Sequence, residues 1–369
     1  MLIEVVHEFE RFASLTSEWN ELLGASASDC PFLTAEWLQA WWTRLADGRS
    51  LHLVLAREGG RLMAAAPLLA EAGPLGMFPR LAFLGTGNAG SDYLDVIVRC
   101  GHERDGLQAI ASTLTRGGRS LRLDHVADAS LALSLAERLT STGWTMRRSA
   151  ANVCPIVLLA GHTWETYLAS LGASHRANVR RRTRALASAF PVRFDRVTSE
   201  DERRRALDTL VELHLARFGH TGSTAFLSPE LCAFHHEATR RALKGGWLRM
   251  FVLRLDEVPA AVMYGFAYNR RFYFYQHGFD PRFESFSVGL VLMGQTIRAA
   301  LDEGMLEFDM LYGAESYKRL WARVERPLMR LHLYPPHIGG LVNRRTEEAE
   351  RTVRAVARRI LTMGAARAS

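Results

Sequence analysis

Residues able to do chemistry gather between positions 273 and 318. A predicted strand at 273–278 is followed by a loop and by Ser287, Val288 and Gly289, which open a predicted helix. A glycine in the first helical turn leaves backbone N–H groups accessible, and the helix dipole favours negative charge there. The pattern indicates a place for a pyrophosphate group, and a serine before a helix is also an ordinary helix cap.

The same stretch ends in a second polar group. Asp309 lies at the end of a predicted strand, and Glu315, Tyr317 and Lys318 follow it. Only two of the 46 lysine and arginine residues are lysines, Lys318 and Lys244. A codon bias toward arginine is the simplest reading of this composition. A lysine that is kept therefore indicates that the position needs a lysine.

Other catalytic patterns are absent or misplaced. Residues 85–90 fit G-x-G-x-x-G, but a strand-like segment follows where a dinucleotide site needs a helix. The spacing of His7, His235 and His236 does not fit H-E-x-x-H, so no metal site is predicted. No G-x-S-x-G elbow or Walker A loop occurs.

The elements that position these residues follow a mixed α/β pattern that occurs twice. A strand, a charged turn and a second strand opening on two small residues are predicted at 51–68 and again at 248–265. Residues 121–124 resemble 306–309 in pattern and in place. We therefore predict two copies of one unit, each with a central mixed sheet flanked by helices.

Length and composition agree with two globular units. The chain has 369 residues, of which 48% are hydrophobic and 23% are charged, which excludes a disordered or fibrous protein. We place the first unit at 1–160, the second at 161–336 and a basic helix at 337–369. The four separate cysteines, the lack of a signal peptide and the short longest apolar run, 62–70, predict a cytoplasmic protein with at most peripheral membrane contact.

Positive charge is concentrated in two segments. The net charge is +7, and residues 174–205 carry ten arginines against four acidic residues. Residues 341–369 carry seven arginines against three acidic residues. Such segments indicate an anionic partner, such as a phosphate ligand, a nucleic acid or a lipid head group, or else solvated helix faces.

Taken in order, the motifs resemble a known family, the BioF2-like acetyltransferase domain of the GNAT superfamily, which is related to the FemAB-type aminoacyltransferases. The resemblance rests on an ordered series: Asp280-Pro281, Ser287-x-Gly289, Gly304, Phe308-Asp309 and Gly313-x-Glu315-x-Tyr317-Lys318. The basic stretch 174–181 resembles a helix of the same domain. Residues 92–95 are similar to the N-terminal half of the CelD-type cellulose-biosynthesis acetyltransferases.

The resemblance implies tandem GNAT-like folds with an acyl-CoA site in the second. Acetyl-CoA or another acyl-CoA would be attacked directly by an amine, without a covalent enzyme intermediate. Tyr275 and Gln276 would lie on a splayed strand whose N–H groups polarise the thioester carbonyl. Ser287, Val288 and Gly289 would contact the phosphates, although the usual Q/R-x-x-G-x-G/A loop keeps only Gly289 here.

The implied reaction needs a base for the acceptor ammonium and an acid for the leaving thiolate. Asp309 and Glu315 are candidates for the base or an amine anchor, with a helix cap and a solvated helix face as their structural alternatives. Tyr317 is a candidate acid or a core residue. Lys318 binds a phosphate or carboxylate, or forms a surface ion pair with Glu315. His277 is a further candidate base or a structural histidine.

Three hypotheses follow. The first is an acyl-CoA-dependent N-acyltransferase of cell-envelope, exopolysaccharide or cellulose metabolism, whose sugar- or envelope-linked amine acceptor is held by Arg176, Arg180 and Arg181. The second is a FemAB-like transferase that takes its acyl group from aminoacyl-tRNA, which the basic segments motivate. The third is a non-catalytic GNAT-like subunit that binds a partner in polysaccharide assembly.

Overall fold

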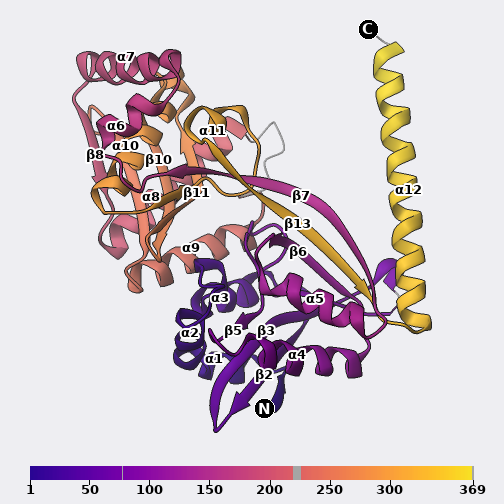
Figure 1. Cartoon of the computed structure of the whole chain (residues 1–369). Coiled ribbons are helices and arrows are strands. Elements are labelled where there is room, and N and C mark those ends of the chain that lie inside the picture. The colour runs from indigo at the N-terminus through magenta and orange to yellow at the C-terminus, as the bar shows by residue number, and fades with distance from the viewer. Residues whose placement is uncertain (77, 219–225, 368–369) are drawn as a thin grey trace.

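One mixed sheet runs through both halves of the chain. The computed structural model describes residues 1–76, 78–218 and 226–367, and within them 13 strands form a single sheet with helices packed on its faces (Figure 1). The predicted mixed α/β class with a central sheet flanked by helices is confirmed. No helix in the described part of the chain is long and apolar enough to span a membrane.

The first half contributes seven strands and five helices. The strands are β1 (Leu2–Val6), β2 (Ser50–Glu58), β3 (Arg61–Glu71), β4 (Arg80–Phe83), β5 (Ile97–Val98), β6 (Leu121–Ala127) and β7 (Thr145–Leu158). The helices are α1 (Phe9–Ser14), α2 (Thr16–Gly24), α3 (Ala35–Leu45), α4 (Glu103–Gly117) and α5 (Leu131–Ser141), with short 3₁₀ turns η1 (Pro31–Leu33) and η2 (Pro74–Gly76).

The second half repeats this arrangement and adds a terminal helix. Its strands are β8 (Val192–Arg196), β9 (Leu248–Leu255), β10 (Val258–Tyr268), β11 (Arg271–Phe279), β12 (Glu307–Asp309) and β13 (Val324–Tyr334). Its helices are α6 (Trp164–Ser170), α7 (Ala173–Ala189), α8 (Glu200–Phe218), α9 (Pro229–Lys244), α10 (Val288–Asp302), α11 (Ser316–Trp321) and α12 (Ile338–Arg367), and η3 (Pro281–Phe286) precedes α10.

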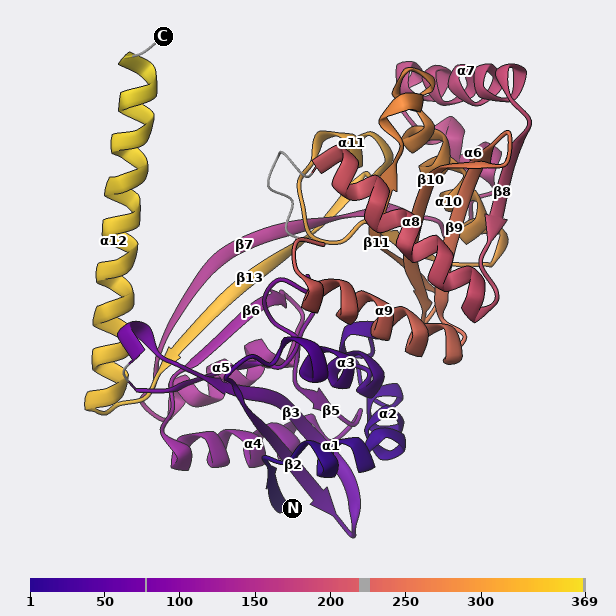
Figure 2. The same cartoon turned by 180° about the vertical axis from the view of Figure 1, so that it is seen from behind.

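The two halves exchange their last strands. In each half a short strand is the parallel neighbour of an earlier one: β6 pairs with β4, and β12 pairs with β11. The next strand of each half then crosses to the other half, so β7 pairs antiparallel with β12 and β13 pairs antiparallel with β6. β7 and β13 also pair with each other over most of their length, and they run side by side between the halves (Figures 1 and 2).

Alternating side chains on the second half's strands serve two separate cores. Met250, Val252 and Tyr264 belong to a core that also contains the first half's Trp37. Phe251 and Met263, their neighbours in sequence, face the core under α6, α7 and α10. This alternation is what a strand with both faces covered requires. The first half therefore packs directly on one face of the second half's sheet.

Two local expectations were wrong in detail. One helix is predicted over residues 9–23, but it breaks at Leu15, where the hydroxyls of Ser14 and Thr16 bond to nearby carbonyls and compete with the helix. A strand is predicted over 93–98, but only β5 forms there. The reason is that Tyr93 has a φ of +59°, and Asp95 turns to accept N–H groups at the start of α5.

The C-terminal helix α12 projects from the body (Figures 1 and 2). Its first turns are anchored by Asn343, which donates to Ser120 Oγ at 3.1 Å, and by Glu347, which accepts from Tyr334 at 2.6 Å. A basic helix is predicted at 337–369, and a helix is present at Ile338–Arg367. Its side chains after Val353 and residues 368–369 lie outside the described part of the chain.

Gly265 marks the closest backbone approach in the second half's sheet. The pairing of β10 with β11 shifts register between Tyr264 and Gly265, so that Tyr275 is an extra residue on β11. A Cβ atom at Gly265 would lie 2.2 Å from the carbonyl oxygen of Tyr273. Only a residue without a side chain fits there.

We predict that Gly265→Ala lowers the free energy of unfolding by about 2 kcal/mol or more, because the clash is with backbone and cannot be relieved by a side-chain rotation. Urea unfolding measures the effect. Gly117→Ala is the matched control, since nothing lies within 4 Å of a Cβ atom at that position. Equal stability of the two variants would contradict the bulge geometry.

Candidate active site

The two parallel strands of the second half diverge at their ends. β11 and β12 are paired over three residues, the last pair being Tyr273 and Asp309. β11 then continues to Phe279 and has no strand partner on that side among the described residues. The bulge at Tyr275 bends β11 on its other edge. The predicted splayed strand is therefore present, and two cavities border it.

The first, here called the apolar cavity, has a volume of about 540 Å³ and lies beside the start of α10. Met263, Leu290, Met293 and Trp321 give it an apolar lining. The predicted donor-binding residues Ser287, Val288 and Gly289 all line it. Sequence and structure thus agree on where these residues lie, and their role in binding a donor stays a prediction.

The second, here called the inter-half cavity, has a volume of about 600 Å³. The first half contributes residues 87–90 and His125 to its lining. The second half contributes Tyr275 and Gln276 from β11, together with Tyr312 and Lys318. The hydroxyl of Tyr275 donates to the carbonyl oxygen of Ala89, which ties the glycine-containing loop to the bulge.

Three residues line both cavities: His277, Glu315 and Tyr317. The ring centroids of His277 and Tyr317 are 5.9 Å apart. The His277 ring also lies 5.2 Å from that of Phe274. The structure therefore brings three of the five predicted catalytic side chains to the boundary between the two cavities. We call these three residues the shared wall.

The start of α10 has the geometry of an uncapped helix. Ser287 has a φ of +58°, and its side chain makes no capping hydrogen bond. The first N–H groups of a helix have no partner within the helix, so they are available to a ligand. A Cβ atom at Gly289 would lie 3.1 Å from the Phe279 ring, so a larger residue would crowd that ring.

Lys318 forms the predicted ion pair with Glu315, although the lysine side chain itself is buried. Its side chain is 5% exposed, and Nζ lies 3.1 Å from Glu315 Oε2. The same ammonium donates to the carbonyl oxygen of Tyr312 at 2.8 Å and to that of Leu311 at 3.4 Å. Three donors thus meet three acceptors, and Leu311 is held at a φ of +54°. A planar guanidinium does not reproduce this arrangement.

Asp309 lies away from both cavities. Its fully buried carboxylate accepts from the hydroxyl of Tyr93 at 2.6 Å, from the N–H of Leu311 at 2.8 Å and from Arg326 at 3.1 Å. Burial raises the pKa of Asp309 to about 6. Asp309 therefore joins residues of both halves and lines neither cavity. This position suits a positioning role better than the role of a base.

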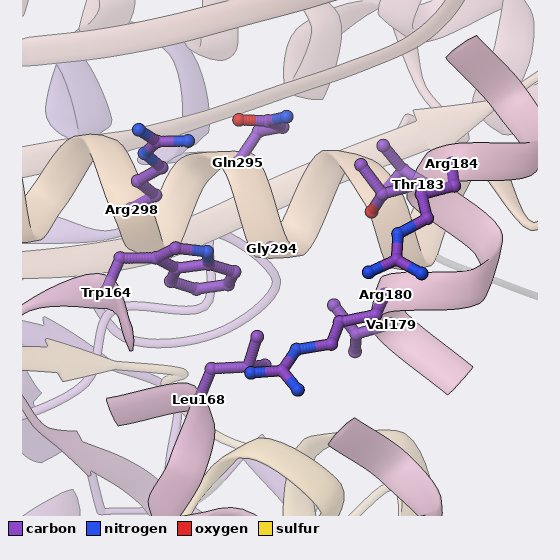
Figure 3. Close-up of a pocket in the computed structure, with 10 residues that line it drawn as sticks. Trp164, Leu168, Val179, Arg180, Thr183, Arg184, Gly294, Gln295 and Arg298 are labelled. Atoms are coloured by element: carbon purple, nitrogen blue, oxygen red, sulfur yellow. The ribbon is translucent and has the colours of Figure 1, made fainter. Parts of the chain in front are cut away.

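The predicted acceptor arginines also lie elsewhere. Arg176 donates to the carbonyl oxygens of Ala169 and Leu171 at the end of α6, and Arg181 donates to Asn178 on its own helix. Arg180 borders a separate small hollow with Trp164 (Figure 3). None of the three arginines lines the apolar cavity or the inter-half cavity.

Several lining residues escaped the sequence prediction, and two of them are His125 and His175. His125 lines the inter-half cavity and bonds through Nδ1 to the buried Asp92 at 2.7 Å. His175 lines the apolar cavity, with its ring 4.6 Å from that of Trp321, and burial lowers its pKa. His175 lies within the basic stretch 174–181, so the resemblance of that stretch to a family helix was a signal for it. No local signal marks His125, since its partner is 33 residues away.

A comparison with protein families decides the identity of the second half. The family model described as Acetyltransferase (GNAT) domain matches residues 173–319. Residues 173–319 are a GNAT acetyltransferase domain. The predicted superfamily is thereby confirmed. The match lies within the second half of the chain, and it supports an acyltransferase enzyme.

Solved structures share the fold of most of the chain. FemX superposes with a TM-score of 0.63 at 11% identity, covering 90% of this chain and 97% of FemX. The structure of L-PGS from Bacillus licheniformis superposes with a TM-score of 0.55 at 13% identity, covering 89% of this chain and 96% of that one. At such identities the likeness concerns the fold. A search of curated proteins found no match.

The described residues contain no group of three or more histidine, cysteine, aspartate or glutamate side chains arranged to hold a metal ion. The polar side chains that line the two cavities carry hydroxyl, imidazole, carboxylate and ammonium groups. They are suited to proton transfer and to polarisation of a carbonyl.

We predict that Lys318→Met destabilises the GNAT domain by about 3 kcal/mol, because it leaves a carboxylate and two carbonyl oxygens without their cation. Chemical unfolding measures the loss. The matched control is Lys244→Met at the other lysine, which is exposed at the end of α9. Equal effects at the two positions would show that burial of Lys318 carries no energetic weight.

We predict a pH-dependent effect of Asp309→Asn. The pKa of Asp309 is raised from 3.8 to about 6 in the folded state, so the folded state binds the proton more tightly than the unfolded chain. The stability that this proton contributes is full below about pH 4 and is lost by about pH 6. Relative to the wild type, the variant should therefore gain about 3 kcal/mol between these pH values, at roughly 1.4 kcal/mol per pKa unit.

Urea unfolding at about pH 4 and about pH 7 measures this difference. Asp128→Asn, at an exposed residue of the same type, controls for the substitution itself. A stability gap between wild type and Asp309→Asn that is the same at both pH values would contradict the assignment.

Proposed function

We propose that the chain is an acyl-CoA-dependent N-acyltransferase that transfers an acyl group to an amine by direct attack. The observation that carries this proposal is the shared wall of His277, Glu315 and Tyr317 between two cavities. A reaction of two substrates without a covalent intermediate needs both of them bound at once with their reacting atoms side by side. The two cavities meet at these three residues. The GNAT domain match supports the acyl donor class.

The donor is assigned to the apolar cavity. Its apolar lining suits an acyl chain and a pantetheine arm, and the uncapped start of α10 suits the pyrophosphate. Ser287, Val288 and Gly289 stand at that helix start, as a phosphate contact requires. The thioester would then reach the shared wall, where the N–H groups of β11 near the Tyr275 bulge polarise its carbonyl.

The acceptor is assigned to the inter-half cavity. The amine attacks the thioester carbon, the C–S bond breaks, and the thiolate leaves as a thiol after taking a proton. Tyr317 on the shared wall is placed to supply that proton, and His277 and Glu315 are placed to contact the amine. Lys318 acts indirectly in this proposal, because it holds Glu315 and the backbone of Tyr312.

A second donor is favoured by one specific observation. The chain shares its fold with FemX over 90% of its length, and the FemAB-type transferases that the sequence resembles use aminoacyl-tRNA. The exposed arginines of α7, which do not line either cavity, would then contact an anionic backbone outside the site. The donor would still place its acyl group at the shared wall.

The biological setting in this proposal rests on the sequence resemblance. The CelD-like features of residues 92–95 favour a sugar- or envelope-linked amine in exopolysaccharide or cellulose metabolism, and a cytoplasmic location. Genes neighbouring this one provide a direct check, because a polysaccharide cluster would narrow the acceptor at once.

We predict that acetyl-CoA or a longer acyl-CoA binds the full chain in calorimetry, and that Leu290→Trp weakens this binding at least about tenfold by filling the apolar cavity. Leu306→Trp is the matched control, because Leu306 is exposed and does not line the cavity.

Comparing acyl chains of increasing length shows whether the apolar lining holds the acyl group. The absence of acyl-CoA binding by a folded protein would contradict the main proposal. A gel shift with charged tRNA at low and high salt tests the second donor, since such binding is salt-sensitive. No shift at low salt would eliminate that donor.

A further inference from the structure

His125 is the one histidine that the first half contributes to the inter-half cavity. It lies near the end of β6, the first-half counterpart of β12. Its side chain is 22% exposed, and the residue lines the cavity. The second half's Tyr312 and Lys318 line the same cavity. A reactive group of the first half thus faces the site of the GNAT domain.

A buried carboxylate orients this ring. Asp92 is 1% exposed in its side chain, and its Oδ1 lies 2.7 Å from His125 Nδ1. Asp92 Oδ2 accepts from the N–H of Tyr312 at 2.7 Å. An ionised carboxylate only accepts hydrogen bonds, so in the neutral ring the proton is on Nδ1 and the lone pair is on Nε2. Nε2 forms no hydrogen bond with any residue of the described chain.

Packing and backbone conformation fix the ring further. The His125 and Tyr312 rings are stacked, with centroids 5.1 Å apart and planes 2° apart. His125 has a φ of +59°, and Tyr93 and Leu311 nearby have φ values of +59° and +54°. A non-glycine residue with its backbone in the left-handed region costs energy, and such strained residues cluster at functional sites.

The two carboxylates that the sequence predicts as bases are less suited to this task. Asp309 is enclosed by Tyr93 and Arg326, away from the cavities. The carboxylate of Glu315 is already engaged by the Lys318 ammonium at 3.1 Å. His125 combines an oriented ring, a carboxylate behind it and a nitrogen directed away from that carboxylate.

We propose that His125 is the general base that takes a proton from the acceptor ammonium, and that Asp92 is the positioning residue that holds its tautomer. This inference rests on the proposed N-acyltransferase function. It makes the first half a contributor to catalysis, because the base comes from one half and the shared wall comes from the other.

The reaction begins with a proton transfer. His125 Nε2 takes one proton from the acceptor R–NH₃⁺, which leaves R–NH₂ and an imidazolium stabilised by the Asp92 carboxylate. The amine lone pair forms the new C–N bond, and the C–S bond electrons leave with the sulfur. The attacking nitrogen loses its second proton as the thiolate gains one, giving an amide and a thiol. His125 then returns its proton to water.

A comparison of two nucleophiles distinguishes a general base from a structural histidine at position 125. Ethanolamine is mainly protonated at neutral pH and needs a base, whereas hydroxylamine is mainly unprotonated and does not. With acetyl-CoA as donor, we expect His125→Ala to reduce kcat/KM for ethanolamine by about 10²-fold or more, with little change for hydroxylamine. Added imidazole should restore ethanolamine transfer, because the alanine leaves the space of the ring.

His125→Gln provides a second variant with a polar side chain, and calorimetry with acetyl-CoA checks that both variants keep donor binding. His102→Ala, at a histidine outside both cavities, is the control. Asp92→Asn should lower ethanolamine transfer more than hydroxylamine transfer. Wild-type rates with ethanolamine in both His125 variants would overturn the proposal.

Loss of hydroxylamine transfer to the same degree as ethanolamine transfer would also overturn it, since it would indicate general damage to the site. Failure of the proposed function has a different signature. In that case the wild type neither binds acetyl-CoA nor releases CoA with either nucleophile, and the assignment of His125 falls together with the reaction.

Discussion

The exchange of β7 and β13 is the constraint on which the rest of the structure depends. β7 ends the first half but pairs with β12 of the second half, and β13 ends the second half but pairs with β6 of the first. Neither half therefore completes its sheet alone. β13 carries Arg326 to Asp309 in one half and Arg330 to Asp124 in the other. These two buried aspartates occupy matching strands, and one strand therefore fixes both halves in register. The inter-half cavity exists because of this fixed relation.

The sequence predicted the parts of the fold that depend on local patterns. The two hairpins and the start of α10 at Val288 follow from spacing and residue type. The tandem arrangement followed from comparing residues 121–124 with 306–309. The strand exchange did not, because an antiparallel neighbour leaves no mark in the sequence of either strand.

In the candidate site, too, local sequence patterns were predictable and contacts between distant segments were not. His277, Ser287, Glu315 and Tyr317 were found because they lie within one continuous stretch that resembles a family. The enclosure of Asp309 depends on Tyr93 and Arg326, and the burial of Lys318 depends on how the backbone at Leu311 turns. Such contacts join distant segments, so residue type alone did not separate a base from a buried anchor. His125 was missed for the same reason.

The exchanged strands also bear on how such a chain arises and how it fails. Two separate copies of the unit that swapped their last strands would make the same sheet, so the fold has the form of a swapped dimer joined into one chain. The matched family region, 173–319, includes neither β7 nor β13. Produced alone, that region would expose the edge of β12 to any passing strand, and misassembly between chains would compete with folding.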